Sequence, residues 1–314
     1  MSAQLLVLCG PTATGKTALS LALAERLNGE IVSADSMQVY RGMDIGTAKA
    51  SPEERARVPH HMLDVADPSE NYSVARYVEE ASRCCDDILA RGKLPILTGG
   101  TGLYIDSLLA GRSFGGEDED GGALRLALGA DYDRLGGDAM LKRLREVDPA
   151  RAAKLHSGDK RRIVRALEVF ERTGMTITEH DARTRAQPPR YTARRIVLSF
   201  ADREALYARI DRRVEEMAVQ GLFEEVEALL DAGLSPDCTA MQAIGYKEAA
   251  LALRGDMSRG EAVALIQQSS RRYAKRQLTW FRRAPDARWI LWEGAPDIAA
   301  AASEIRNSEF GIRN

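Results

Sequence analysis

The chain has 314 residues, and its 44 Lys or Arg and 46 Asp or Glu give a formal net charge of −2. Hydrophobic residues make up 45% and charged residues 29%, which excludes a disordered, collagen-like or coiled-coil protein. The longest apolar runs, at 4–9 and 94–98, are far shorter than the ~18–20 residues that cross a bilayer. The first residues also lack the pattern of a secretory signal. We therefore expect a cytoplasmic protein with one large domain or two ordinary ones.

The cysteines give no sign of a metal or redox site. Their spacing fits neither a disulfide framework nor a zinc site, and no CxxC pair is present. We interpret them as small core residues or partly exposed thiols in a reducing compartment. These cysteines are Cys9, Cys84, Cys85 and Cys238.

Charge is distributed unevenly along the chain. Residues 140–200 hold fifteen Lys or Arg and seven Asp or Glu, which is a local excess of +8 (15 − 7). A second basic run consists of Arg271, Arg272, Lys275, Arg276, Arg282 and Arg283. Such runs suit a polyanionic partner. On charge alone, solvated helix faces explain them equally well.

Strand and helix patterns alternate over the first ~110 residues. The run at 5–9 is typical of a buried parallel strand, and 16–27 repeats leucine every four residues like an amphipathic helix. Further strands are predicted at 30–34 and 94–98, and further helices at 73–91, with Ser73 as N-cap, and from 102 onward. This order predicts an α/β fold, a P-loop-type parallel sheet flanked by helices.

The pattern changes after residue 114. Residues 115–122 form an acidic, glycine-flanked loop, and residues 123–182 show helical patterns alone. A strand pattern resumes at 195–200; helices follow to 281, then a last strand at 289–292. We therefore predict a core of residues 1–114 and 191–314, interrupted by a helical insertion at 115–190.

The first strand is followed by a phosphate-binding motif. Residues 10–17 match G-x-x-x-x-G-K-[ST], with a strand before them and a helix after them. Glycines let several backbone N–H groups point at one anion, and the helix N-terminus adds positive potential. Lys16 supplies a full charge, and Thr17 a hydroxyl for Mg²⁺. The predicted loop residues are Gly10, Pro11, Thr12, Ala13, Thr14, Gly15, Lys16 and Thr17.

The motif indicates a polyphosphate without identifying its carrier. A small-molecule kinase using ATP fits it, with Asp35 at the end of the second strand holding Mg²⁺ through water. A second interpretation uses Asp35, Ser36 and Gln38 as a base, a hydroxyl and an amide at the ligand end of the sheet. An ordinary Asx-type turn explains the same residues. Residues 60 and 61 are both histidine. Neighbours in a strand face opposite sides, so the two are poor joint metal ligands and we predict structural roles for them.

Several segments, taken together and in order, resemble the bacterial tRNA dimethylallyltransferase family, also called tRNA isopentenyltransferase. The resemblance spans residues 4–283. It rests on 10–17, 33–49, 60–64, 67–68, 72–74, 99–104, 159–174 (DKRRIVRALEVFERTG), 241–246 (MQAIGY) and 273–281 (YAKRQLTWF).

The resemblance implies an activity and a set of site residues. The family moves a dimethylallyl group from its diphosphate to the exocyclic N6 of the adenosine 3′-adjacent to the anticodon, with Mg²⁺ assisting. The loop at 10–17 would hold that diphosphate, Thr17 the metal, and Asp35 and Thr101 would be catalytic. The implied tRNA contacts are Asp35, Ser36, Met37, Gln38, Thr101, Asp159, Lys160, Arg161, Arg162 and Ile163.

Three classes of function therefore remain from the sequence. These are prenyl transfer to tRNA, phosphorylation of a small molecule by ATP, and RNA binding without catalysis through the basic insertion. An adenine N6 amine is a poor nucleophile, so the first needs a neutralised leaving group, an aligned amine and a proton acceptor. The base must also leave its stack, as base-modifying enzymes require. We expect a monomer that contacts no membrane.

Overall fold

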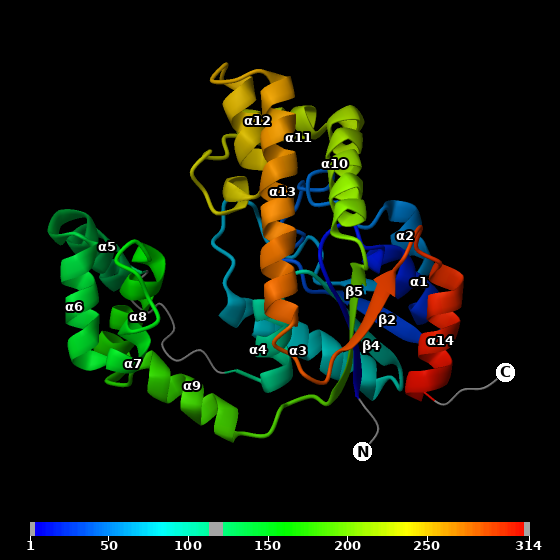
Figure 1. Ribbon diagram of the computed structural model, residues 1–314, viewed down its shortest axis with the longest axis horizontal. Helices are drawn as coiled ribbons and strands as arrows, with labels where there is room; N and C mark the ends of the chain where they lie inside the picture. Colours follow the sequence, from blue (N-terminus) through cyan, green and yellow to red (C-terminus); the bar gives the residue numbers. More distant parts are fainter. Residues whose placement is uncertain (1–3, 113–121, 311–314) are drawn as a thin grey trace. The chain divides into compact units, whose positions relative to one another are not determined.

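A computed structural model of the chain describes residues 4–112 and 122–310, and these contain a six-stranded parallel sheet (Figure 1). Its strand order is β3-β2-β4-β1-β5-β6. The predicted P-loop-type parallel sheet is confirmed. The strands are β1 (Leu5–Cys9), β2 (Gly29–Ser33), β3 (His60–His61), β4 (Leu94–Gly99), β5 (Ala193–Phe200) and β6 (Arg288–Trp292).

Strand β1 lies at the centre of the sheet, between β4 and β5. All five of its residues are buried, which explains why its sequence is an unbroken apolar run. Val7 pairs with Leu97 on one side and with Arg195 on the other. The connection after β1 leads to β2 on one side of it, whereas the connection after β4 leads to β5 on the other side. Ligands bind parallel sheets where neighbouring strands are connected in opposite directions in this way.

Helices cover both faces of this sheet (Figure 1). Helices α1 and α14 pack against each other on one face, and α3 and α4 lie on the other. Helices α10 to α13 pack together beyond the carboxyl end of β5. The helices of this part are α1 (Lys16–Leu27), α2 (Pro52–Arg57), α3 (Val74–Ala90), α4 (Gly102–Ala110), α10 (Arg203–Gln220), α11 (Leu222–Asp231), α12 (Tyr246–Leu253), α13 (Arg259–Phe281) and α14 (Ile298–Phe310).

The long predicted helices are present, with their ends shifted by a few residues. Ser73 caps α3 as expected, since its side chain accepts a hydrogen bond from the backbone N–H of Arg76. The short helix α2 and the two-residue strand β3 had no prediction, because neither is long enough to show a period. In the part of the chain that the structure describes, no helix is long and apolar enough to span a bilayer.

Residues 110–190 form a second compact unit. A core that includes Leu144 and Leu167 holds its helices together. The buried carboxylate of Glu168 is paired with the arginines at 125, 165 and 172. Its helices are α5 (Ala123–Leu135), α6 (Gly137–Val147), α7 (Pro149–Ala152), α8 (Lys160–Thr173) and α9 (Ile177–Ala186).

The first unit comprises residues 1–109 and 191–314. We predicted domain limits at 114/115 and 190/191. Most of the predicted acidic loop at 115–122 lies outside the described residues; Gly122 is its described member. Within the predicted helical stretch at 123–182, Gly136, with a positive φ of 85°, separates α5 from α6.

A buried carboxylate next to strand β3 explains the adjacent histidines. Glu30 is 2% exposed and accepts hydrogen bonds from Arg91 (2.8 Å) and Lys93 (2.7 Å). His61 Nε2 lies 2.8 Å from the same carboxylate, whereas His60 Nδ1 lies 2.7 Å from the carbonyl oxygen of Val58. The two imidazoles therefore face different partners, and their predicted structural roles are confirmed.

Glu30→Ala should lower the free energy of unfolding by about 3 kcal/mol at pH 7, because Arg91 and Lys93 lose a buried counter-charge and His61 loses its hydrogen-bond partner. Hydrogen bonding from Arg91, with Lys93 and His61 adding to it, holds the pKa of Glu30 well below its ordinary value. The stabilisation is therefore complete above the ordinary glutamate pKa of about 4.3 and declines below it. Urea unfolding at pH 7 and pH 3 should show a smaller difference from wild type at pH 3. A difference that does not change with pH would contradict this account.

Candidate active site

The sheet order places three functional segments next to one another. The phosphate loop follows β1, Asp35 lies just after β2, and Thr101 follows β4. Because β2, β4 and β1 are consecutive in the sheet, their carboxyl ends meet at one edge. A cavity of about 720 Å³ opens there, lined by the phosphate loop, residues 35–38 and 98–100, and helices α10 and α13.

The phosphate loop has the curled backbone that its sequence predicts. Gly10 has a φ of +143°, and a Cβ there would lie 2.3 Å from the carbonyl oxygen of Leu198. Ala13 and Gly15 have φ values of +64° and +85°. Alternation through left-handed backbone turns successive N–H groups toward one point, which forms an anion-binding nest. Helix α1 begins directly afterwards at Lys16.

Lys16 lies inside this loop. Its Nζ donates hydrogen bonds to the carbonyl oxygens of Gly10 (3.0 Å) and Pro11 (2.5 Å). Burial lowers the pKa of Lys16 to about 8, and the nearby Arg213 contributes to the same effect. A bound polyanion would stabilise the charged form of Lys16 and so offset the cost of burying this charge.

Residues far away in the sequence hold the loop in shape. Trp292 Nε1 donates to the carbonyl oxygen of Thr14 at 3.0 Å. The buried Gln277 accepts from the N–H of Thr12 at 3.3 Å and donates to the carbonyl oxygen of Gly100 at 3.0 Å. The amide of Gln277 thereby fixes the phosphate loop relative to the segment after β4.

The segment after β2 forms a tight turn. One carboxylate oxygen of Asp35 accepts the N–H of Met37 at 2.9 Å, which is the predicted Asx-type turn. An ionised carboxylate has about four acceptor sites, so this turn leaves capacity for a ligand. The backbone N–H of Ser36 donates to Thr101 Oγ1 at 3.1 Å. Thr101 therefore holds the turn that carries Asp35.

The amide of Gln38 contacts the protein itself. Its Oε1 accepts from Ser33 Oγ at 2.9 Å, and its Nε2 donates to the carbonyl oxygens of Thr47 (3.1 Å) and Ala48 (3.3 Å). Gln38 thus links the Asp35 turn to residues 44–48. The sequence analysis placed this amide at the ligand end of the sheet and did not foresee the internal link.

Four arginines line the cavity. Three of them had no prediction, and the fourth was predicted only as a member of the second basic run. Arg209, Arg212 and Arg213 come from α10, and Arg276 comes from α13. Arg213 Nε is buried, and among the described residues no hydrogen-bond partner for it is found. Arg212 and Arg213 follow Arg209 by three and four residues, so the three lie near one another on a helix that directly follows a strand. This spacing was the signal in the sequence that could have placed them at the site. Of the basic run at 271–283, Arg276 lines the cavity, whereas Arg271 pairs with Asp211.

The predicted tRNA contacts at 159–163 lie in the second unit, at the start of α8. Arg161 and Arg162 are exposed, whereas Lys160 pairs with Asp133 at 2.6 Å. Ile163 is 0% exposed and belongs to the hydrophobic core of this unit. Its side chain faces inward one helical turn after the cap, so the tRNA contact of Ile163 stays a prediction that this side chain does not support.

Many other basic residues in the 140–200 run have acidic partners within their own unit. The local charge excess is therefore partly neutralised by ion pairs, of which the two with Glu168 are made to a buried carboxylate. The pairs are Arg143–Glu171, Arg165–Glu168, Arg172–Glu168, Arg194–Glu309 and Arg195–Asp106.

The nest at 10–17, the lysine within it and the surrounding arginines define a P-loop-type site whose charges suit a polyphosphate group beside the carboxylate of Asp35. Two family models match the chain. "IPP transferase" covers residues 38–284, and "Isopentenyl transferase" covers residues 3–65. The chain therefore belongs to the tRNA dimethylallyltransferase (isopentenyltransferase) family.

Similar proteins and structures agree with this assignment. The tRNA dimethylallyltransferase of Geobacter sulfurreducens is 50% identical over 287 residues, which cover 91% of each chain. That of Carboxydothermus hydrogenoformans is 44% identical and covers 100% of this chain and 99% of the relative. The crystal structure of the Bacillus halodurans tRNA isopentenylpyrophosphate transferase matches with a TM-score of 0.73 at 42% identity, covering 99% and 96%. A eukaryotic dimethylallyltransferase acting on tRNA matches with a TM-score of 0.79 at 28% identity, covering 98% and 79%.

Proposed function

We propose that this chain transfers a dimethylallyl group from dimethylallyl diphosphate to the exocyclic N6 of the adenosine 3′-adjacent to the anticodon in tRNA. Diphosphate is released. The observation that carries the proposal is a single cavity that holds the phosphate nest and the Asp35 turn side by side. A phosphate site beside a base suits a group-transfer reaction, and membership of the family favours substitution at the carbon bonded to the diphosphate over phosphoryl transfer.

The reaction needs three contributions from the chain. The phosphate nest, with Lys16 and arginines such as Arg213, holds the donor diphosphate and stabilises the charge that develops on it. The N6 nitrogen forms a bond to C1 of the dimethylallyl group while the C1–O bond breaks, and the electron pair leaves with diphosphate. The carboxylate of Asp35 accepts the proton that N6 loses. Thr101 is a positioning residue for that carboxylate through its bond to Ser36.

Mg²⁺ fits this site through Thr17. Among the described residues, no cluster of three or more His, Cys, Asp or Glu could hold a metal ion. A dedicated cage is not needed, since Mg²⁺ keeps several waters and takes few protein ligands beside substrate phosphate oxygens. The hydroxyl of Thr17, which lines the cavity, suits that role. Bound there, the ion would neutralise charge on the departing diphosphate.

The substrate adenosine reaches this cavity only after leaving the stack of the anticodon loop. The second unit would contact phosphates of the anticodon stem-loop through exposed basic residues near the start of α8, including Arg161 and Arg162. Asp35, Ser36 and Met37 line the cavity and would contact the adenosine. The monomeric state and the cytoplasmic location stay predictions.

The test is transfer of label to tRNA. The purified chain is incubated with radiolabelled dimethylallyl diphosphate, Mg²⁺ and unmodified tRNA. Label in the tRNA at the adenosine beside the anticodon is the expected result. ATP-dependent labelling of a small molecule would instead support a kinase, and retention of tRNA without transfer would support an RNA-binding protein.

The double charge reversal Arg161→Glu with Arg162→Glu should weaken tRNA binding about 10-fold or more at 100 mM salt. Each lost phosphate contact removes about 0.7–0.9 from the slope of log K against log salt concentration. Filter binding at several salt concentrations measures both changes. Donor KM should stay the same, because these residues belong to the second unit. An unchanged salt slope would remove this patch from the tRNA surface.

A further inference from the structure

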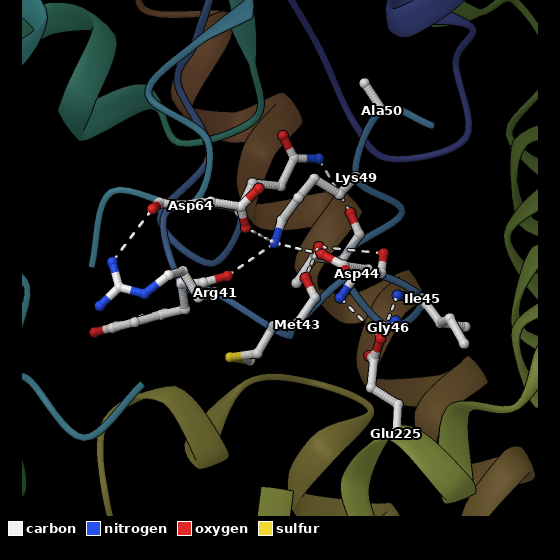
Figure 2. Close-up of polar contacts among 12 residues, drawn as sticks. Arg41, Met43, Asp44, Ile45, Gly46, Lys49, Ala50, Asp64 and Glu225 are labelled. Carbon is white, nitrogen blue, oxygen red and sulfur yellow. Dashed lines mark hydrogen bonds and ion pairs between the residues drawn. The ribbon is translucent and has the colours of Figure 1, made fainter. Parts of the chain in front are cut away.

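Residues 46–48 line the reaction cavity, and a single carboxylate from helix α11 holds the backbone at 44–46. Glu225 of α11 accepts the backbone N–H groups of Asp44 (2.8 Å) and Ile45 (2.8 Å) through Oε2, and that of Gly46 (3.1 Å) through Oε1 (Figure 2). Three consecutive N–H groups converging on one anion are a backbone nest whose anion is part of the protein.

The same carboxylate also fixes an aromatic wall of the cavity. Tyr246 donates its hydroxyl hydrogen to Glu225 Oε1. Its ring packs so closely on Gly46 that a Cβ at Gly46 would lie 2.4 Å from Tyr246 Cε2. Gly46 and Tyr246 both line the cavity, whereas Glu225 lies behind them.

A buried lysine holds the other end of this segment. Lys49 is 9% exposed and donates to the carbonyl oxygen of Tyr40 (2.8 Å) and to the carboxylates of Asp44 (2.6 Å) and Asp64 (2.7 Å) (Figure 2). Arg55 adds a hydrogen bond to Asp64 at 2.7 Å. Residues 44–49 are therefore fixed at both ends by charged groups that do not line the cavity.

The fixed segment connects directly to the catalytic turn. The carbonyl oxygens of Thr47 and Ala48 accept from Gln38 Nε2, and Gln38 Oε1 accepts from Ser33 at the end of β2. Asp35 lies between Ser33 and Gln38 in the chain. A shift of residues 44–48 would therefore move both the wall that faces the substrate and the turn that carries Asp35.

We propose that Glu225 is a positioning residue for the transfer reaction. Its carboxylate sets the backbone at 44–46, and through Gln38 this backbone sets the Asp35 turn relative to the donor diphosphate. The inference rests on the proposed function. The phosphate nest at 10–17 is held by other residues, Gln277 and Trp292, so donor binding does not depend on Glu225.

The matched variants are Glu225→Gln and Glu227→Gln. Both remove one negative charge from α11 without a large change in volume, but Glu227 is exposed. In Glu225→Gln, an NH₂ group replaces one of the two oxygens that accept backbone N–H bonds. We expect kcat for prenyl transfer to fall about 10- to 100-fold, since a misplacement of ~1 Å can cost 100-fold. The binding constant for inorganic diphosphate should stay within 2-fold of wild type. Glu227→Gln should behave as wild type.

A double-mutant cycle separates positioning from general loss of structure. If Glu225 acts through Gln38, the two substitutions disturb the same link. The kcat of the double variant Glu225→Gln with Gln38→Leu should then be only slightly lower than that of the slower single variant. Fully additive losses in kcat would overturn the proposal, as would equal rates for Glu225→Gln and Glu227→Gln. Failure of the wild-type chain to transfer label would instead count against the proposed function itself.

Glu225→Asp guards against a variant that does not fold. Aspartate keeps the charge but is one methylene shorter, so it reaches fewer of the three N–H groups. A folded Glu225→Asp with reduced kcat and wild-type diphosphate binding supports positioning. Loss of diphosphate binding in parallel with kcat, in either variant, would show that Glu225 only maintains the fold and would overturn the proposal.

Discussion

Lys16→Ala should lower kcat/KM for dimethylallyl diphosphate by at least about 10²–10³-fold, the range for loss of one donor to a developing anion. The lysine Nζ lies within the curl of the phosphate loop, against the carbonyl oxygens of Gly10 and Pro11. Without it, the nest keeps its backbone N–H groups but loses the full charge that opposes the departing diphosphate. Steady-state transfer assays with varied donor concentration measure the loss.

The fold should survive this replacement. Burial lowers the pKa of Lys16, which means that the folded protein without ligand disfavours the charged ammonium. The melting temperature of Lys16→Ala should therefore be no lower than that of wild type, and tRNA affinity should stay within a few-fold. Lys247→Ala, which removes an exposed lysine from α12, is the control and should be fully active. A large drop in melting temperature would mean that Lys16 is mainly structural.

Arginine should not restore activity at this position. The ammonium of Lys16 fits between two backbone carbonyl oxygens, and a planar guanidinium has a different size and shape. Near-normal transfer by Lys16→Arg would indicate that only positive charge in the cavity matters. The arginines of α10 would then be the main contacts of the diphosphate.

The parts of the site that could be predicted from sequence are those encoded within a few residues. The phosphate loop is contiguous, and its flanking apolar strand and leucine-rich helix are visible in the sequence. Asp35 was found because polar residues directly after a buried strand lie at the ligand edge of a parallel sheet. The parallel sheet itself followed from alternation of strand and helix. Its strand order did not, since periodicity says nothing about which strands are neighbours.

The parts that were missed depend on contacts between distant segments. Gln277 braces the phosphate loop from 265 positions away, and Glu225 holds residues 44–46 from about 180 positions away. The sequence around a glutamate on an amphipathic helix does not show whether its carboxylate binds distant backbone N–H groups or is simply solvated. The burial of the Ile163 side chain was missed for a related reason. A motif names consecutive residues, whereas a helix exposes some of them and buries others.

Asp35→Asn should reduce transfer by about 10²–10⁴-fold, the usual contribution of a general base. Asparagine keeps an oxygen that can accept the N–H of Met37, so the turn after β2 should hold its shape. What it loses is the ability to take a proton from N6. Single-turnover transfer from labelled donor, with tRNA in excess, reports this chemical step directly.

Binding measurements decide whether Asp35 acts as a base or as a contact. The dissociation constant of tRNA for Asp35→Asn should lie within a few-fold of wild type, and diphosphate should bind at least as well. Diphosphate affinity should not fall, because Asp35 is an anion near Lys16 and Arg213 and opposes a second anion there. Loss of tRNA binding that accounts for the whole rate defect would exclude the base assignment. Transfer within 10-fold of wild type would exclude it as well, since a neutral amide cannot replace a proton acceptor.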